Sequence, residues 1–371
     1  MSERNMSERK LKHVIVGVGA TVLNMHRPAL ALDTVDLVGA MDIRHDAGRE
    51  RADSLGCPYF TDYKEMIAET KPDVVVVMTP HTSHAEIAIH GLEAGCHVLV
   101  EKPIAVQVKE ADAMVAAMRR TGRCLAVNFQ QRFRPEIVAA HQLIQSGALG
   151  KIQHIDMVLS WLRTAAYFRM GGWRASWAGE GGGVLINQSI HDLDILCHLL
   201  GAPAALTGWT RTIQQAIETE DTVQAMFRWE NGAMGSLFVS TAVGSRPYRL
   251  EIVGSQGMLQ IGQGTIQYEA YEQDVREFID TSPEPFGVLP GVPQEIALGD
   301  STGAHVDVYK NLHAAILDGA PLLVAADTAV AALELANGIT LASAQGGEVS
   351  LPLDRDAYAA LLARYTAGGK S

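Results

Sequence analysis

The sequence is poor in cysteine, in basic clusters and in long hydrophobic runs, and each shortage excludes a class of protein. Its four cysteines lie far apart without a CxxC pair, which argues against a disulfide framework or a zinc site and favours reduced thiols in the cytoplasm. The net charge of −12, with no basic run to offset it, argues against nucleic-acid binding. No apolar run reaches the length of a membrane span, and residues 1–12 do not resemble a signal peptide.

The chain of 371 residues is long enough for two domains, and its first half alternates strand-like and helix-like runs. Residues 1–10 repeat Met-Ser-Glu-Arg, and we expect them to be a disordered leader. Residues 11–127 are then predicted to form a Rossmann domain, a doubly wound parallel sheet. The predicted strands are His13–Val16, Val35–Met41, Val74–Met78, His97–Val100 and Cys124–Val127. The predicted helices are 21–32, 46–55, 62–69, 82–94 and 107–121.

From Lys151 the pattern changes to alternating runs separated by glycine-rich turns, which is typical of an antiparallel sheet. The predicted strands are Ile152–Trp161, Ala204–Ile213, Thr222–Trp229, Met234–Val239, Leu250–Val253 and Met258–Ile261. Residues 272–302 hold four prolines and are predicted to be irregular, with helices at 303–318, 324–345 and 354–365. We therefore expect 128–371 to form an α+β domain with a large, mostly antiparallel open sheet for substrate binding and oligomerisation. Its C-terminal helices could cover that sheet or pack back on the first domain.

The first predicted strand leads into Gly17–Val22, the position of a dinucleotide-binding turn. Gly17 permits the tight turn, and Gly19 lets a pyrophosphate approach the backbone at a helix N-terminus. Val22 replaces the usual third small residue, so the motif depends on its place between a strand and a helix. Asp42 ends the second strand, where a carboxylate binds ribose hydroxyls and repels a 2′-phosphate. Arg44 could instead bind that phosphate, so NAD is predicted and NADP is the less favoured cofactor.

Further cofactor contacts are predicted from the loops after later strands. Gln130 could reach the nicotinamide carboxamide, although Gln131 and Arg132 beside it could equally be ties between domains. His84 could be a cofactor contact or only a first-turn residue. The predicted cofactor-binding residues are Gly17, Gly19, Ala20, Thr21, Val22, Asp42, Ile43, Arg44, Thr79, Pro80, His84, Glu101, Lys102 and Gln130.

The strand-like run Val98–Val100 ends in Glu101-Lys102-Pro103, which marks the predicted reactive centre. In open α/β sheets, ligands bind outside the carboxyl ends of the strands. A lysine near apolar walls can have its pKa lowered enough to handle protons near neutral pH. We therefore predict that Lys102 is catalytic.

A second cluster of polar residues lies on one predicted helix, Ile186 to Leu200. It follows Gly181–Gly183, a flexible backbone that can approach a ligand closely. Four polar residues are predicted to share one stripe of this helix: Asn187, His191, Asp194 and His198. His191 can exchange protons near pH 7 and is predicted to be the catalytic partner of Lys102. The alternative is a capped helix with interior histidines, and Asp194 is expected to orient His191 or brace the helix.

Residues 161–177 are rich in aromatic side chains and arginines, which suit a polyhydroxylated ring with or without an anionic group. In the alternative interpretation, half of them only pack a loop. The predicted substrate-binding residues are Lys102, Arg163, Tyr167, Trp173, Arg174, Asn187 and His191. No metal site is predicted.

Together these motifs resemble the glucose–fructose oxidoreductase/inositol dehydrogenase (Gfo/Idh/MocA) family, over nearly the whole chain after the leader. The resemblance implies a Rossmann domain, a C-terminal domain whose open sheet often forms homodimer or homotetramer contacts, and a catalytic lysine–histidine pair at Lys102 and His191. Many sugar- and inositol-oxidising members carry aspartate where this chain has Asn187. Because asparagine cannot relay a proton, Asn187 is expected to bind a substrate hydroxyl.

We therefore expect a cytoplasmic NAD(P)-dependent enzyme that oxidises a secondary alcohol of a sugar, inositol or sugar derivative to a ketone, or catalyses the reverse. Hydride passes to nicotinamide while Lys102 or His191 takes the hydroxyl proton. One alternative is redox-neutral, NAD-dependent glycoside cleavage. Another is a non-enzymatic NAD- or sugar-sensing protein, against which the intact Lys102/His191 pair argues. No nucleic-acid or membrane partner is expected.

Overall fold

The computed structural model describes residues 9–369, so most of the predicted leader lies outside the described residues. Two compact units are present. Among the described residues, the first contains the chain up to Gln130 together with Gly179–Gly181 and Gly303–Leu333; the second contains Gln131–Ala178, Gly182–Thr302 and the rest of the described chain from Glu334. The domain limits 11–127 and 128–371 stay a prediction. Within residues 9–369, no helix has both the length and the apolar character needed to cross a membrane.

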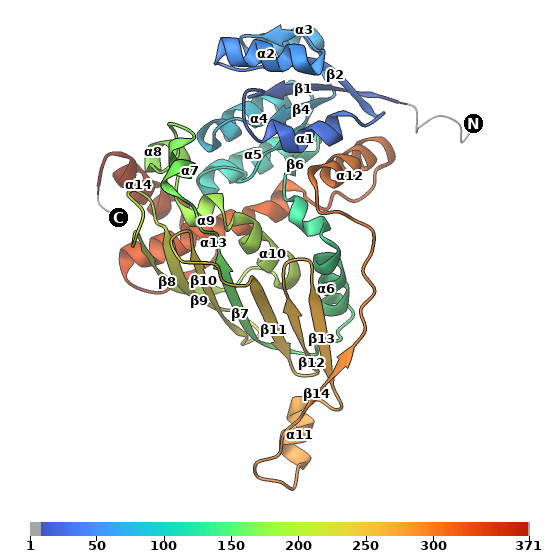
Figure 1. Ribbon diagram of the computed structural model, residues 1–371, viewed down its shortest axis with the longest axis vertical. Coiled ribbons are helices and arrows are strands. Elements are labelled where there is room, and N and C mark those ends of the chain that lie inside the picture. The colour runs from blue at the N-terminus through green and yellow to red at the C-terminus, as the bar shows by residue number, and fades with distance from the viewer. Residues whose placement is uncertain (1–8, 370–371) are drawn as a thin grey trace, which may run out of the picture. The chain divides into compact units, whose positions relative to one another are not determined.

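The first unit contains a six-stranded parallel sheet in the order β3-β2-β1-β4-β5-β6. Figure 1 labels β1, β2, β4 and β6 of this sheet. Its strands are β1 (Leu11–Val16), β2 (Val35–Met41), β3 (Tyr59–Phe60), β4 (Val74–Val77), β5 (His97–Val100) and β6 (Leu125–Val127). This is the Rossmann strand order. Strands are added toward one side of the sheet from β1 to β3 and toward the other side from β4 to β6, so the predicted doubly wound sheet is confirmed. Only the two-residue β3 was not predicted, because it is too short to show a periodic pattern.

Helices connect these strands, and apolar runs of β-branched residues form the buried strands. All four valines of β4 are inaccessible to solvent, as expected for a strand covered on both faces. Helix α1 packs against α12, and α4 packs against α5. The helices are α1 (Leu23–Leu30), α2 (His45–Leu55), α3 (Tyr63–Thr70), α4 (His84–Glu93), α5 (Val108–Thr121) and α12 (His305–Asp318).

The second unit contains a nine-stranded sheet in the order β14-β13-β12-β11-β7-β10-β9-β8-β15. Among the described strands of this sheet, β10 and β7 form the parallel pair and the other neighbours are antiparallel. The mostly antiparallel sheet is therefore confirmed. The strands are β7 (Ile152–Ser160), β8 (Ala205–Arg211), β9 (Thr222–Arg228), β10 (Met234–Ser240), β11 (Arg249–Gly254), β12 (Gly257–Ile261), β13 (Ile266–Tyr271), β14 (Gly291–Gln294) and β15 (Val349–Ser350).

One face of this sheet is covered by helices and the other is open. Along β9, Ala225 and Phe227 are buried while Met226 between them is exposed, as strand geometry requires. Trp209 and Met234 are also exposed, on β8 and β10. The helices of this unit are α6 (Pro135–Gln145), α7 (Ala165–Arg169), α9 (Val184–Asn187), α10 (Ile190–Leu200), α11 (Val275–Thr281) and α14 (Arg355–Thr366). The division between the units falls within α8 (Trp177–Glu180) and within α13 (Ala326–Gln345).

The predicted single helix from Ile186 to Leu200 is wrong, because the chain breaks between α9 and α10. The carbonyl of Val184 causes the break by accepting hydrogen bonds from the backbone N–H of Gln188, the backbone N–H of Ser189 and the Ser189 hydroxyl. The serine thus competes with the regular helical ladder. Asn187 and His191 consequently belong to different helices.

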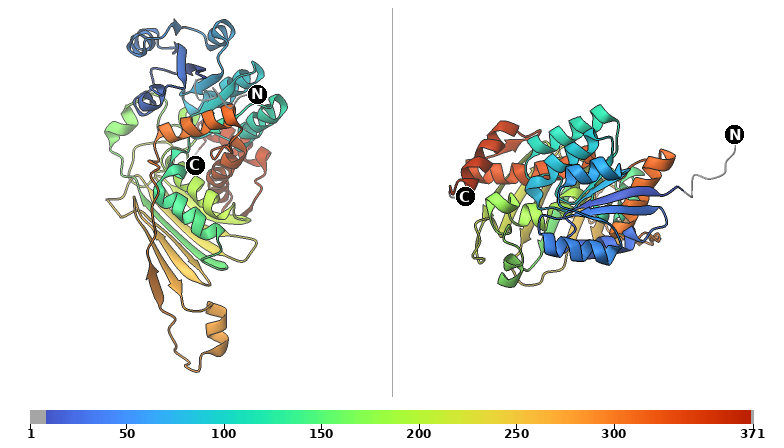
Figure 2. Two further views of the ribbon diagram at one scale, coloured as in Figure 1. Left: turned by 90° about the vertical axis from the view of Figure 1, so that its right-hand side faces the viewer. Right: turned by 90° about the horizontal axis from the view of Figure 1, so that it is seen from above.

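Residues 272–302, predicted to be irregular, contain α11 and β14 and form a long projection that we call the arm. Two views show the arm extending away from the end of the nine-stranded sheet (Figures 1 and 2). Large apolar side chains on the arm are exposed, Phe286 by 94% and Val288 by 80%. Because the segment holds four prolines, the sequence pattern predicted irregular structure instead of these short elements.

Candidate active site

The glycine turn lies between β1 and α1, and both of its glycines are required by close contacts. Gly17 has a φ of +93°, and a Cβ there would lie 2.9 Å from the backbone of Met78 and Thr79. A Cβ on Gly19 would lie 2.7 Å from Oδ2 of Asp42. Ala20, Thr21 and Val22 complete the turn before α1 begins at Leu23. The backbone at this helix N-terminus is therefore shaped to accept a closely approaching group.

Asp42 lies at the end of β2 and is 4% exposed. Its Oδ2 accepts the backbone N–H of Gly19 at 2.8 Å, while Oδ1 accepts from the backbone N and Nε of Arg44 at 2.9 and 3.2 Å. Ile43, between them, is 79% exposed. The carboxylate thus braces the glycine turn, and Arg44 partly neutralises its charge.

The loop after β4 is tied to the loop after β5 through His84. The His84 ring is fully buried, with Nδ1 2.8 Å from the carbonyl of Pro103 and Nε2 2.9 Å from that of Thr79. Thr79 also accepts a hydrogen bond from the Ser83 hydroxyl, and Pro80 beside it is exposed. Burial lowers the pKa of His84 despite its two carbonyl partners.

Glu101 and Lys102 follow β5, at the same end of the sheet as the glycine turn. Glu101 is buried, and its Oε1 lies 2.7 Å from Nε2 of His26 and 3.4 Å from Nε2 of His305. The Asn128 amide also donates to Oε1. Oε2 accepts the backbone N–H of Lys102, whose side chain is half-buried. The predicted reactive lysine is therefore attached to a carboxylate that is held rigidly in place.

A buried polar atom near the end of this sheet fits the predicted dinucleotide. Oε1 of Gln130 is inaccessible to solvent and, within the described part of the chain, has no hydrogen-bond partner. A buried amide oxygen without a partner costs about 1–3 kcal/mol, which a carboxamide N–H of nicotinamide would relieve. The close-approach glycines and this oxygen fit NAD.

In the second unit, α9 and α10 carry the predicted substrate residues. Asn187 and His191 are both buried, 8% and 9% exposed. The neighbouring Asp192, which the sequence analysis did not select, accepts from Nε1 of Trp161 at 3.2 Å. Burial, and then the charge of Asp192, raise the pKa of Tyr248 far above its usual range. Asp192, the residue directly after His191, is thus a buried acidic group.

Asp194 does not share this environment but forms a buried ion pair with Arg132. Nε of Arg132 donates to Oδ2 at 2.8 Å, and both side chains are almost completely buried. Of the two expected alternatives for Asp194, bracing the helix describes this contact. His198 stacks on His141, and burial followed by the charge of Arg132 lowers its pKa to about 3, so it stays neutral.

Two arginines of residues 161–177 lie over the ring of Tyr167, and one of them also lies over Trp173. The guanidinium of Arg174 lies 4.6 Å from the Tyr167 ring centre and 4.5 Å from that of Trp173, and the guanidinium of Arg163 lies 5.2 Å from Tyr167. The Tyr167 hydroxyl accepts from Arg174 at 2.7 Å and from Gln188 at 3.0 Å. Gln188, directly after Asn187, was not predicted. The cluster thus joins this loop to the turn between α9 and α10.

Gly183 must lack a side chain because another part of the chain approaches its backbone closely. A Cβ there would lie 2.0 Å from the carbonyl oxygen of Glu220. Its backbone N–H, like that of Leu185, also donates to the Glu220 carboxylate. The glycine allows a close approach, and Glu220 is the group that approaches.

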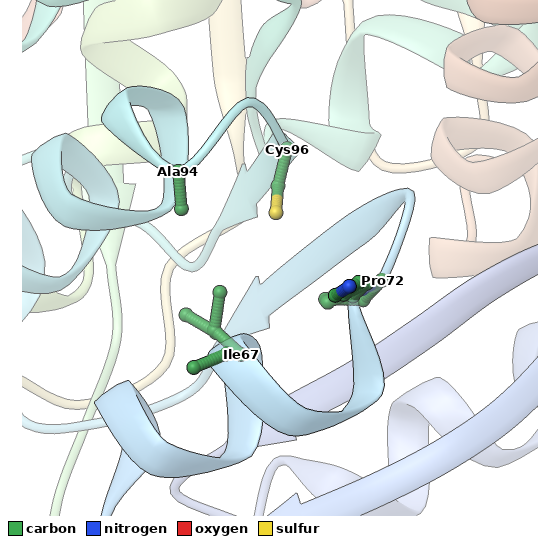
Figure 3. A pocket seen from close by; sticks show the side chains of 6 residues that line it. Ile67, Pro72, Ala94 and Cys96 are labelled. Atoms are coloured by element: carbon green, nitrogen blue, oxygen red, sulfur yellow. The ribbon is translucent and has the colours of Figure 1, made fainter.

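A hollow at the opposite end of the first sheet has no comparable chemistry (Figure 3). It is lined by Ile67, Ala68, Lys71, Pro72, Ala94 and Cys96, just before β4 and β5 begin. Burial raises the pKa of the Cys96 thiol to about 11, so it stays protonated. We therefore place the candidate active site at the carboxyl ends of the strands.

Two family models match most of the described chain. Residues 11–129 match an oxidoreductase family model with an NAD-binding Rossmann fold, and residues 137–260 match a GFO/IDH/MocA C-terminal domain. A solved structure of the WlbA dehydrogenase from Bordetella pertussis, in complex with NADH and UDP-GlcNAcA, shares 27% identity with a TM-score of 0.81. The similarity covers 94% of this chain and 99% of that one.

Curated relatives are similar over shorter stretches. A D-glucoside 3-dehydrogenase of Escherichia coli K12 is 30% identical over 61% of this chain and 64% of its own length. A scyllo-inositol 2-dehydrogenase (NAD+) of Bacillus subtilis is 28% identical over 54% of this chain and 58% of its own length. The chain thus spans about three fifths of these relatives.

Proposed function

The chain belongs to the Gfo/Idh/MocA family of NAD-binding oxidoreductases, and on this premise we propose that it oxidises a secondary alcohol of a sugar, inositol or sugar derivative to a ketone, or catalyses the reverse. The observation that carries the proposal is the position of Lys102. It follows β5, at the sheet end that also carries the Gly17 turn after β1 and Thr79 after β4. The backbone proposed to bind the cofactor and the lysine proposed to transfer the proton thus both lie at the carboxyl ends of the strands, where such sheets bind ligands.

The protein side of this reaction is proton transfer. Nicotinamide, when bound, supplies the hydride acceptor or donor. The substrate hydroxyl must lose its proton as its carbon loses hydride, so a base within hydrogen-bond reach is needed. We assign this proton to Lys102 or His191, with the other residue holding the hydroxyl or relaying the proton. Asn187 binds a substrate hydroxyl through its amide.

The substrate class is supported by the residues around Tyr167. Aromatic faces and guanidinium donors suit a ring with several hydroxyls, and arginine also pairs with carboxylate or phosphate. The relatives are named for a glucoside and an inositol, and the WlbA structure contains a UDP-sugar. Arg163, Tyr167, Trp173 and Arg174 are therefore proposed to bind the substrate ring and any anionic group on it.

The cofactor preference follows from Asp42. A buried carboxylate at the end of β2 accepts hydrogen bonds from ribose hydroxyls but repels a 2′-phosphate. Arg44 is already engaged with Asp42. We therefore propose NAD as the cofactor, with NADP used less efficiently.

An absorbance screen for NADH tests the proposed reaction. Purified protein is incubated with NAD or NADP and with inositols, aldoses, sugar acids, anhydrosugars or nucleotide sugars at several pH values. NADH formation on one class supports the proposal and identifies the substrate. Glycoside cleavage without net NADH would favour redox-neutral chemistry instead, and NAD binding without any turnover would favour a sensor.

Self-association is the proposed partner interaction. The open face of the nine-stranded sheet exposes Trp209, Met226 and Met234, and the arm exposes Phe286 and Val288. These exposed apolar side chains support a homodimer or homotetramer in which the arm of one copy contacts another. The separated cysteines support a cytoplasmic location.

A further inference from the structure

The carboxylate of Glu101 is surrounded by hydrogen-bond donors from three separate parts of the first unit. His26 comes from α1, His305 begins α12, and Asn128 follows β6. The backbone N–H of Lys102 supplies a fourth donor, at 3.3 Å from Oε2. A carboxylate offers about four lone-pair sites, so this one is well satisfied although it is buried.

The protonation states of this cluster follow from its contacts. Burial disfavours the ionised carboxyl, but hydrogen bonds from His26 and His305 outweigh it and hold the pKa of Glu101 well below its usual value. Burial also lowers the pKa of His26, so this ring is neutral. Because an ionised carboxylate only accepts, Nε2 of His26 carries the proton, and Nδ1 accepts from the Tyr309 hydroxyl at 2.9 Å. The bonds therefore run in one direction, from Tyr309 through His26 to Glu101.

The turn that carries Lys102 is held on both sides. Before the lysine, Glu101 is fixed by its donors; after it, the carbonyl of Pro103 lies 2.8 Å from Nδ1 of His84. Helix α1, which carries His26, follows the glycine turn directly. The lysine backbone is thus connected to the proposed cofactor-binding helix through one hydrogen-bonded side chain, Glu101.

We propose that Glu101, His26 and His305 are positioning residues that fix the backbone of Lys102 for proton transfer, an inference that rests on the proposed function. The alternative is that the cluster only stabilises the fold. Misplacement of a catalytic group by about 1 Å can cost about 10²-fold in rate, so a frame of this kind matters for turnover. Positioning therefore predicts a loss of rate beyond any loss of stability.

Metal binding is a weaker explanation of the same cluster. The three side chains place possible ligand atoms within 4.8 Å of one another. A metal ligand must be deprotonated, so an ion would require His26 to lose the proton that it donates to Glu101. The hydrogen bonds already satisfy this carboxylate without an ion.

The chain offers a matched control for this inference. His13 and His313 form another buried histidine pair in the same unit, with their Nε2 atoms 3.1 Å apart. His313 lies on α12, the helix that begins with His305. Each of the variants His305→Gln and His313→Gln therefore removes one buried imidazole from the same helix, but only His305→Gln removes a partner of Glu101.

Kinetic measurements test the inference together with the proposed function. Glu101→Gln keeps the size of the side chain, and we expect it to lower kcat by about 10- to 100-fold on the substrate found by the screen. His305→Gln should lower kcat in the same direction, while the dissociation constant for NADH stays at the wild-type value. His313→Gln should lower the melting temperature and leave kcat unchanged.

Chemical labelling tests positioning without any substrate. Reductive methylation with formaldehyde and cyanoborohydride, followed by mass spectrometry, measures the reactivity of Lys102 relative to exposed Lys151. Both Glu101→Gln and His305→Gln should change this ratio, and His313→Gln should not. Because this result does not depend on turnover, an inactive wild type would contradict the proposed function while labelling still decides the positioning.

The inference is overturned if His305→Gln and His313→Gln change stability, kcat and labelling alike, since the cluster would then be structural only. It is also overturned if a folded Glu101→Gln variant keeps wild-type kcat and labelling. If Glu101→Gln does not fold, the comparison of the two α12 variants decides the question.

Discussion

Arg132 and Asp194 form a buried, two-point ion pair between the segment before α6 and the middle of α10. Removing one partner would leave the other charge buried without compensation. We expect Asp194→Ala to destabilise the protein by about 3–5 kcal/mol, measured by urea unfolding. The exposed pair Arg120–Glu93 is the control, and Arg120→Ala should cost about 0–1 kcal/mol. Equal losses in the two variants would contradict the importance of burial.

Lys102→Ala should keep NAD binding and lose turnover. Loss of a positioned proton-transfer group costs about 10²–10⁴-fold in rate, and we expect a decrease of that order in kcat. The measurements are steady-state kinetics and fluorescence titration with NADH. Lys109→Ala, at an exposed position on α5, is the control and should leave both unchanged. Near-wild-type turnover by Lys102→Ala would remove Lys102 from the mechanism.

Asp42→Ala should shift the cofactor preference toward NADP. The substitution removes the charge that repels a 2′-phosphate and frees Arg44 to bind it, so the ratio of kcat/KM for NADP over NAD should rise about tenfold or more, equivalent to about 1.4 kcal/mol. Absolute affinity for NAD should also fall, because the backbone N–H of Gly19 loses its acceptor, the Asp42 carboxylate, and the turn is less well held. Asp46→Ala, at an exposed position on α2, is the control. An unchanged ratio would contradict the role of Asp42 in selection.

The His13–His313 pair should make stability depend on pH. Burial of the ring lowers the pKa of His13 from 6.5 to about 4, although the Leu11 carbonyl and nearby aspartates act in the opposite direction. The unfolded chain therefore binds more protons between these values, and stability present above pH 6.5 is lost as pH falls toward 4. This loss should reach about 3 kcal/mol. His13→Gln should flatten the dependence in urea unfolding, whereas exposed His45→Gln should not; identical slopes would contradict the assignment.

Phe286→Ser combined with Val288→Ser should weaken self-association. Both side chains are exposed on the arm, and transfer of each to an interface removes apolar surface from water. Size-exclusion chromatography with light scattering should show a smaller species for this variant at the same concentration. Met25→Ser, at another exposed apolar position, is the control. A monomeric wild type would refute the proposed assembly directly.

Much of the fold could be predicted from sequence because its signals are local. The run of valines in β4 predicts a strand buried on both faces, and the alternation along β9 predicts a strand with one buried face; each pattern spans only a few residues. The break at Ser189 could not be predicted, since serine is also tolerated within helices and only the Val184 carbonyl reveals the competition. The short elements of the arm were hidden by prolines that usually indicate irregular structure.

The residues of the candidate site that belong to a local sequence motif could be predicted, whereas those brought together only by contacts between distant parts of the chain could not. Gly17, Asp42 and Lys102 follow strands in a recognisable order. His26 and His305 have no such signal, because their importance arises only when α1 and α12 meet at Glu101. Histidine on a helix face is usually an ordinary packed residue, so sequence alone gives no reason to select either.

The first unit is assembled from separated stretches of chain, and this affects how it can form during translation. The edge strand β6 receives its last backbone partner from Val324, whose carbonyl accepts the N–H of Val127 at 2.9 Å. The ribosome therefore releases the glycine turn and Lys102 long before the residues that complete their unit. A nascent chain that ends near Gln130 should expose an unfinished sheet edge and a Glu101 without His305, and is expected to need protection from chaperones until α12 and then Val324 emerge.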